Sequence, residues 1–292
     1  MPKLYLAKVN LNSKIFSVYE NNLNISDVLK CVYENINSEE KYITSNKSYH
    51  TDSIGNITRY QKKSEYSFVG LKKDNMVITG IILRNFTKPS EEEDPVTKKL
   101  CTIIKSESIG IRFYFDVQKE LVTFCERQSF GYNQFTMAFN QLLNKCVKLY
   151  EFETFLQKDK NKLEEKISEL HNITKVRAVL IPPNPNGSNV SSIRERCIST
   201  NSNKMICEFE SDDMRMDSGE MMEIREYVSA GYGDFTAVGT NSNGKAQRIS
   251  SSLDAAYCVE IDDNLEEDDF NSEAKHLIIS FEDYAKNRKI SD

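Results

Sequence analysis

Five side chains between residues 112 and 145 offer the clearest chemistry in this sequence. They combine two guanidinium groups and an ammonium group with a phenol and an amide, and they stand among many aromatic residues: Arg112, Tyr114, Arg127, Gln134 and Lys145. Guanidinium and ammonium groups bind phosphate oxygens, while aromatic rings stack on bases. We therefore expect these residues to form one surface that binds an anionic ligand, such as a nucleic acid or a nucleotide, with no cofactor.

The same residues also have structural explanations, which the sequence leaves open. Alternation along a strand puts Arg112 and Tyr114 on one face, and such a face can simply be solvated. Arg127 can pair with a nearby carboxylate, and Gln134 can help to cap the next helix. If Arg127 and Gln134 bind a ligand instead, that ligand is an anion, because the unpaired backbone N–H groups at the start of the helix favour negative charge.

A hairpin and an amphipathic helix must position these side chains. Alternating apolar residues predict strands at Ile111–Asp116 and Leu121–Cys125, and a glycine then leads into a helix over Tyr132–Val147. That helix carries one apolar stripe, so it must pack on a sheet or on another helix. Three elements are expected next, namely a strand over 149–156, a helix over 160–170 capped by Asp159, and a strand over 173–181.

This order of elements favours an α+β fold with antiparallel hairpins. A strand, a short helix and a strand in so few residues are typical of the split βαβ arrangement of ferredoxin-like folds. We expect the unit over 149–181 to share one core with the hairpin over 111–125, and the long helix to cover that core. Three later features are a helical region over 191–228, a hairpin that turns at Asn243 and Gly244, and a terminal helix over 273–286.

The N-terminal part of the chain is expected to form a separate small α+β unit. Residues 1–88 predict three elements, namely a strand at Leu4–Val9, a helix over Asp27–Ile36 and a hairpin over Tyr66–Phe86. The segment PSEEEDP at 89–95 is the best candidate for a linker, although a solvated loop fits it equally well. Residues 96–292 would then form a central and C-terminal α+β domain.

Composition gives the chain no general attraction for nucleic acid. The formal net charge is −6 over 292 residues, so binding to a polyanion requires a local patch. The seven cysteines form no CxxC pair, which favours reduced thiols. The chain begins without a signal-peptide pattern, and no apolar run approaches about 20 residues. We expect a cytoplasmic protein that does not bind membranes.

The sequence carries no complete catalytic signature. It contains no P-loop, no GxSxG and no HExxH, and its three histidines lie far apart. Acids near a lysine occur over 159–166 and 262–275, but in both places the Glu-x-Lys triplet falls in an expected helix and not on a strand. We interpret these acids as solvated charge, and we expect no metal site.

Three segments of the chain together carry a family resemblance. They are FYFDVQKELVTFCERQSFGYNQFTMAFNQLLN, VRAVLIPPNP and GYGDFTAVGTNSNGKAQRISS. In these segments the chain resembles a poorly characterised family of prokaryotic proteins associated with phage defence and abortive infection. The resemblance covers the central and C-terminal thirds of the chain. It implies a cytoplasmic defence component and leaves the activity open.

Three functional hypotheses follow from these observations. The first is a non-catalytic binding or sensor component of a prokaryotic anti-phage defence system, which recognises nucleic acid or a phage product and self-associates or joins a neighbouring defence protein. The alternative is a nuclease or a nucleotide-processing toxin whose active site no motif reveals. A protein that binds only other proteins would instead expose a large apolar patch.

Overall fold

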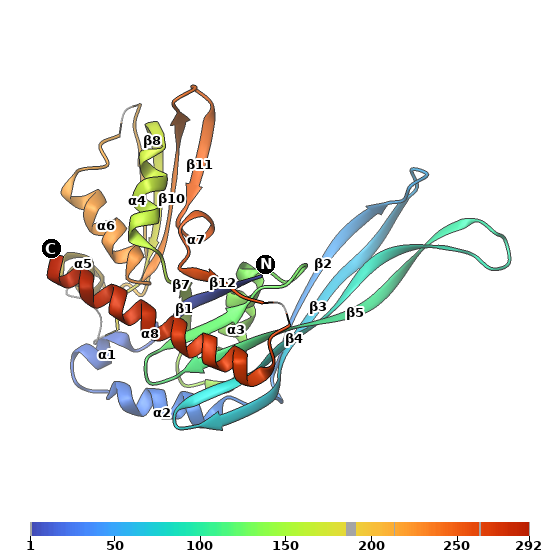
Figure 1. The fold of residues 1–292 in the computed structure, drawn as a ribbon, viewed down its shortest axis with the longest axis horizontal. Coiled ribbons are helices and arrows are strands. Elements are labelled where there is room, and N and C mark those ends of the chain that lie inside the picture. Colours follow the sequence, from blue (N-terminus) through green and yellow to red (C-terminus); the bar gives the residue numbers. More distant parts are fainter. Residues whose placement is uncertain (1, 185–190, 213, 263, 292) are drawn as a thin grey trace.

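The computed structural model describes residues 2–184, 191–212, 214–262 and 264–291. The fold is α+β, as the sequence predicts, with two antiparallel sheets and helices packed against them (Figure 1). The larger sheet extends into a long arm on one side of the molecule, and the smaller sheet lies on the other side (Figure 1). No helix within these ranges is long and apolar enough to cross a membrane.

The larger sheet contains eight strands in the described part of the chain. Its order is β12-β1-β6-β5-β4-β3-β2, and β7 pairs with β1 on the same side as β12. β1 has strand neighbours on both sides, and nearly every one of its residues is buried because both faces of the sheet are covered there. The strands are β1 (Lys3–Leu11), β2 (Lys41–Thr51), β3 (Ile57–Asp74), β4 (Val77–Glu93), β5 (Leu100–Asp116), β6 (Leu121–Cys125), β7 (Phe152–Leu156) and β12 (Cys258–Glu260).

The helix α3 (Tyr132–Val147) packs on one face of this sheet, which confirms the packing predicted for it. The centroid of the Phe139 ring lies 5.7 Å from that of Phe113 and 5.4 Å from that of Phe115. Alternate residues of β5 point into this core, so Ile111, Phe113 and Phe115 are buried. Two shorter helices complete the same core, α1 (Ile15–Tyr19) and α2 (Ile25–Asn35).

The smaller sheet has the order β11-β10-β8-β9 and a core of its own. The hairpin predicted at Asn243 and Gly244 is confirmed, and Gly244 has a φ of +70°, which glycine adopts without strain. The region over 191–228, which was expected to be helical, contains the strand β9 between two helices. The elements are α4 (Lys160–Ser168), β8 (Leu170–Leu180), α5 (Ser191–Thr200), β9 (Met205–Glu210), α6 (Gly219–Ser229), β10 (Gly233–Asn241), β11 (Ala246–Ser250) and α7 (Ser251–Asp254).

The strand–helix–strand unit over 149–181 is present, but its two strands lie in different sheets. β7 pairs with β1 in the larger sheet, whereas β8 pairs with β10 in the smaller one. The predicted sharing of one core is therefore wrong for α4 and β8, which belong to the core of the smaller sheet. Lys158 links the two sheets, because its buried ammonium group lies 2.9 Å from the Gly233 carbonyl oxygen and 2.7 Å from the Asp234 carboxylate.

The helix α8 (Glu267–Ser291) covers the opposite face of the larger sheet and includes the predicted terminal helix (Figure 1). Leu4 and Leu6 of β1 pack with its Phe270 and Leu277. The residues of β1 that alternate with these leucines, such as Tyr5, belong to the core under α3. The two cores therefore lie on opposite faces of one sheet.

Four strands of the larger sheet continue beyond the body as an arm of two hairpins (Figure 1). β2 and β3 pair out to Thr51 and Ile57, and β4 and β5 pair out to Glu93 and Leu100. β3 and β4 pair with each other only as far as Ser64 and Phe86. Beyond that point the two hairpins form no backbone pairs with each other, although side-chain contacts still connect them.

The segment over 89–95, predicted as a linker, is part of the second hairpin. Residues 89–93 belong to β4, and Pro89 fits there because β4 has a strand neighbour on one side only beyond Phe86. Residues on both sides of the segment contribute to one sheet and one core. The chain is therefore not divided there into 1–88 and 96–292.

Candidate functional site

The structure brings two of the five predicted site residues together. Arg112 on β5 and Arg127 after β6 line one small hollow, together with Leu265 and Phe270. The guanidinium of Arg112 donates a hydrogen bond to the carbonyl oxygen of Leu265. Arg127 is exposed, and no ion pair involves it among the described residues.

Tyr114 and its neighbour Asp116 lie on the face of β5 that α8 covers, so this face is not simply solvated. Tyr114 packs against the apolar residues under α8. Burial raises the pKa of the Tyr114 hydroxyl, and it also raises the pKa of the Asp116 carboxyl. The strand therefore alternates as predicted, but both of its faces are packed.

Gln134 and Lys145 have other partners. The side-chain oxygen of Gln134 accepts a hydrogen bond from Arg84 at 3.1 Å, and the cap residue of α3 is Gly131, which offers no side chain. Lys145 donates to the carbonyl oxygen of Lys41 at 2.7 Å. It lies about 20 Å along the helix from Tyr132, at a rise of about 1.5 Å per residue. The five residues therefore do not form one surface.

Arg84 is a buried cation that no pattern in the sequence indicates. It is 4% exposed, and its guanidinium donates to the Ser64 hydroxyl at 3.2 Å and to the Gln134 side chain. The Phe86 ring lies against it, with 4.4 Å between the guanidinium carbon and the ring centroid. Arg84 thus connects the base of the arm to the start of α3 through these hydrogen bonds, and we assign it a structural role.

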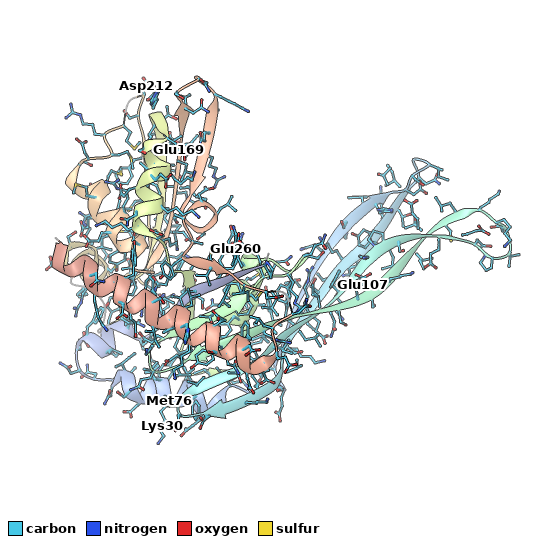
Figure 2. The ribbon with its side chains drawn as sticks, in the orientation of Figure 1. Lys30, Met76, Glu107, Glu169, Asp212 and Glu260 are labelled. Carbon is cyan, nitrogen blue, oxygen red and sulfur yellow. The ribbon has the colours of Figure 1, made fainter. Side chains whose placement is uncertain are left out.

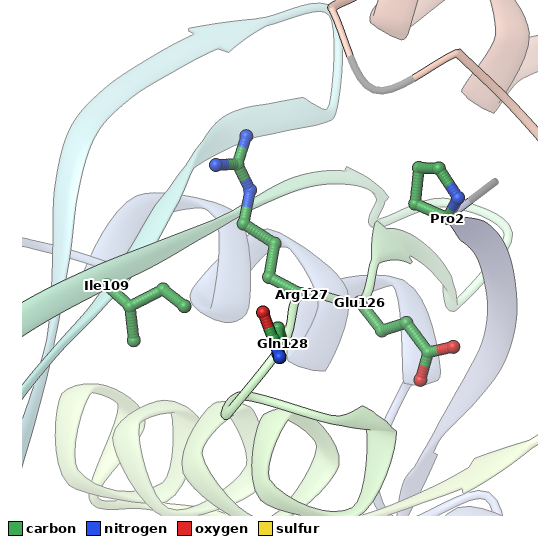
Figure 3. Close-up of a pocket in the computed structure, with 5 residues that line it drawn as sticks. All are labelled: Pro2, Ile109, Glu126, Arg127 and Gln128. Carbon is green, nitrogen blue, oxygen red and sulfur yellow. The ribbon is translucent and has the colours of Figure 1, made fainter.

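A second hollow beside Arg127 has a volume of about 660 Å³ and is open to solvent (Figure 3). Figure 3 shows the Arg127 guanidinium and the Glu126 carboxylate pointing to different sides of it. The Tyr5 hydroxyl donates to Glu126 at 3.1 Å. Because both signs of charge line this hollow, it has no clear preference for an anion. Within the described residues, no three His, Cys, Asp or Glu side chains gather where they can hold a metal ion.

The arm carries a second set of cationic and aromatic side chains, on the β2–β3 hairpin. The register pairs Tyr49 with Arg59, Lys47 with Gln61, and Ser45 with Lys63. Residues directly opposite each other share a face, and alternate residues along a strand share it too. We call this surface the ribbon face and define it as Lys47, Tyr49, Arg59, Gln61 and Lys63.

All five side chains of the ribbon face are exposed, and Tyr49 is 63% exposed. Figure 2 shows the side chains of the arm standing clear of the body. The Arg59 guanidinium carbon lies 5.6 Å from the centroid of the Tyr49 ring, which holds the cation in place. No ion pair involves Lys47, Arg59 or Lys63 in the part of the chain that the structure describes. The charge of Lys63 does help to lower the pKa of the nearby Glu65 carboxyl, after the hydrogen bond and the charge of Lys41, but Lys63 makes no ion pair with it. All three cations can therefore bind phosphates.

The other face of this hairpin is half-buried toward the β4–β5 hairpin. Glu91 of β4 accepts hydrogen bonds from the Ser53 amide at 2.9 Å and from the Ser53 hydroxyl at 2.7 Å. The Nε2 atom of His50 lies 3.4 Å from the same carboxylate. These contacts brace the end of the β2–β3 hairpin, so the ribbon face is held outward.

A signal for the ribbon face does exist in the sequence. Lys47 and Tyr49 are two residues apart, and so are Arg59, Gln61 and Lys63, which is the period of one strand face. The flanking residues are mostly Ser, Asn, Thr and Lys, so no apolar alternation marks the strands. Because no pattern predicts strands here, the two-residue spacing does not by itself indicate that these side chains share one face.

Comparison with known protein families gives a match over most of the chain. A family model described as a domain of unknown function (DUF4747) matches residues 14–277, which run from just before α1 into α8 and include the whole arm. No curated protein matches the chain. The family description states no activity and no link to phage defence.

Proposed function

The chain belongs to the DUF4747 family, and from this premise we propose that the protein is a non-catalytic nucleic-acid-binding component that uses the ribbon face. The observation that carries the proposal is the set of exposed, unpaired cations on one face of a projecting ribbon. Residues 42–64 hold four lysine or arginine side chains against one carboxylate, in a chain whose net charge is −6. Such a local patch is what an acidic protein needs to bind a polyanion.

The geometry of the ribbon suits contact with several phosphates. Side chains on one strand face repeat about every 7 Å, so Arg59 and Lys63 lie about 13 Å apart along β3. Lys47 on β2 adds a third cation on the same face. Long cationic side chains on a rigid ribbon can therefore reach separate phosphates of one strand or of two strands.

The test compares two variants that lose the same charge from the two hairpins of the arm. The first is Lys47→Ala/Arg59→Ala/Lys63→Ala, and the control is Lys88→Ala/Lys98→Ala/Lys105→Ala on the β4–β5 hairpin. Binding of the full chain to labelled DNA and RNA is measured from low to physiological salt. Each lost phosphate contact with duplex DNA lowers the slope of log K against log salt by about 0.9.

We expect the ribbon variant to lose most of its affinity at every salt concentration, and the control to keep the affinity of the wild type. Equal losses in both variants would show that only the total charge matters. Absence of binding by the wild-type protein at low salt would overturn the proposal.

We extend the proposal to anti-phage defence, as a sensor component that acts with a neighbouring defence protein or with itself. Support for this role is the family resemblance in the three quoted segments. Phage plating on cells that carry the gene with its native neighbours tests it. Protection by the wild type that the ribbon variant loses supports the role, and a lack of protection by the wild type contradicts it.

The non-catalytic part of the proposal has its own check. The pure full chain is incubated with Mg²⁺ or Mn²⁺ and with DNA, RNA or nucleotides, and products are separated on a gel. We expect intact substrates. Cleavage that EDTA abolishes would favour the nuclease or toxin alternative, and an Asp262→Ala/Glu273→Ala variant would test the acidic stretch over 262–275 as its source.

A further inference from the structure

Two isoleucines are displayed at the tip of the β2–β3 hairpin. Ile54 is 67% exposed and Ile57 is 68% exposed. Ile57 faces Thr51 across the hairpin, and alternation places it on the ribbon face, two residues beyond Arg59. Ile54 lies in the turn itself. An apolar end therefore follows directly on the cationic surface.

Hydrogen bonds hold the tip in one conformation in the absence of a ligand. One oxygen of the Asp52 carboxylate accepts hydrogen bonds from the Ile54 amide at 3.1 Å and the Asn56 amide at 2.7 Å. The second oxygen accepts from the Asn56 side chain at 3.0 Å. Burial would raise the pKa of Asp52, but these hydrogen bonds outweigh it and hold the pKa below its ordinary value. The Glu91 contacts to Ser53 fix the tip from the other hairpin.

We propose that the nucleic acid is duplex DNA and that Ile54 and Ile57 enter its minor groove as a wedge that unstacks a base step and bends the duplex. This inference rests on the proposed function. Proteins that bend DNA through the minor groove insert apolar side chains between base steps and kink the duplex by about 20–90°. A preorganised tip suits that role, because its insertion does not require the loss of conformational entropy that ordering a flexible tip would cost.

The ribbon face favours a duplex over a single strand. Single-strand binding uses several free aromatic faces on which successive bases stack. The ribbon face holds one aromatic ring, Tyr49, and Arg59 already lies over that ring. What the surface offers instead is a row of cations that ends in apolar side chains.

The same surface favours DNA over a protein or a membrane. Lysine is depleted at the centre of protein interfaces, whereas Lys47 stands in the middle of this face and Lys63 at its end nearest the body. Ser45, the partner of Lys63, lies six residues from Thr51, or about 20 Å from the tip. A groove offers phosphates along that whole length, whereas a bilayer entered by the tip offers them only at its end.

The test uses the full-length protein and a duplex of about 40 base pairs that carries one dye at each end. Binding and bending are measured separately, and a shorter distance between the dyes reports bending. The tip variant is Ile54→Ser/Ile57→Ser, and the matched control is Val96→Ser/Leu100→Ser at the end of the β4–β5 hairpin. Wild type and control should bind and bring the dyes closer. The tip variant should bind within about tenfold of wild type, because phosphate contacts supply most of the affinity, and it should leave the dyes apart.

Failure of the wedge and failure of the proposed function are distinguishable. A tip variant that bends DNA as wild type does overturns the wedge and leaves binding by the ribbon face intact. A Lys47→Ala/Arg59→Ala/Lys63→Ala variant that binds as wild type does overturns the function itself. Tighter binding to single strands than to the duplex, or tip-dependent binding to vesicles of anionic lipid without DNA bending, also overturns the inference.

Discussion

The two hairpins of the arm share a sheet and a core, yet they differ in how their charges are paired. In the β2–β3 hairpin, each cation of the ribbon face lies opposite an uncharged residue, and none has an ion pair among the described residues. In the β4–β5 hairpin, three lysines are paired with glutamates of the same hairpin: Lys88 with Glu107, Lys98 with Glu93 and Lys105 with Glu92.

This difference in charge pairing indicates which charges of the arm matter for folding and which can bind a partner. An exposed ion pair contributes about 0–1 kcal/mol, so neither hairpin depends on its charges for stability. The β4–β5 hairpin shows that a ribbon of this chain can neutralise its own lysines. The free cations of the β2–β3 hairpin are therefore better explained by a ligand than by the fold.

The largest effect tests whether both hairpins depend on one core. Phe139 of α3 is fully buried, and its ring packs on Phe68 of the first hairpin and Phe113 of the second. Phe139→Asp removes this packing, which costs about 3–5 kcal/mol for loss of the ring, and adds a buried charge. We expect a large fall in the thermal midpoint and loss of the structure of both hairpins.

The exposed Gln141 of α3 supplies the control for this prediction. Gln141→Asp introduces the same charge on the same helix and should leave the thermal midpoint close to that of wild type. A Phe139→Asp variant with wild-type stability would contradict the packing.

The next effect separates charge from stacking on the ribbon face. Arg59→Ala removes one cation, so affinity for duplex DNA should fall and the salt slope should decrease by about one. Arg59→Lys keeps the charge but loses the planar group over Tyr49, so it should keep the salt slope and lose less affinity. Lys98→Ala on the other hairpin should change neither quantity. An unchanged slope in Arg59→Ala would remove Arg59 from the contact surface.

A smaller effect concerns the contact between the hairpins. Glu91→Gln keeps one acceptor for Ser53 but loses the charge, so the tip should open more easily by about 1 kcal/mol. Hydrogen exchange at the amides of Ser53 and Ile54 should then be about fivefold faster, and DNA bending should weaken. Glu93→Gln, on the same strand, is the control. Equal exchange rates in both variants would mean that Glu91 does not brace the tip.

Local patterns in the sequence account for much of the fold. Apolar alternation predicts the hairpin over 111–125, the 3.6-residue period predicts α3, and Asp159 accepts a hydrogen bond from the Lys162 amide as the predicted cap of α4. The turn at Asn243 and Gly244 is equally local. In each case, side chains close in the sequence determine the structure.

Local patterns predict neither the arm nor the packing of α8 on one face of β5. The outer part of the arm has no core on either side, so β2 and the ends of β3 to β5 show no apolar period. α8 follows Tyr114 by about 150 residues of sequence, and only tertiary packing brings it over that strand. Of the predicted site, helix geometry alone places Lys145 about 20 Å from Tyr132, at the end of α3 away from Arg127.

The smallest effect tests the surface first predicted from the sequence. If Arg112 and Arg127 contact the ligand, Arg112→Ala/Arg127→Ala should weaken nucleic-acid binding and lower the salt slope. The ribbon proposal instead expects a change of less than about twofold, since two fewer charges on the body alter only the long-range field. Arg112 is already held by the Leu265 carbonyl, and Arg127 shares its hollow with Glu126. A loss as large as that of the ribbon variant would place the ligand at the body as well as the arm, and the charge difference between the two hairpins would then explain only part of the binding.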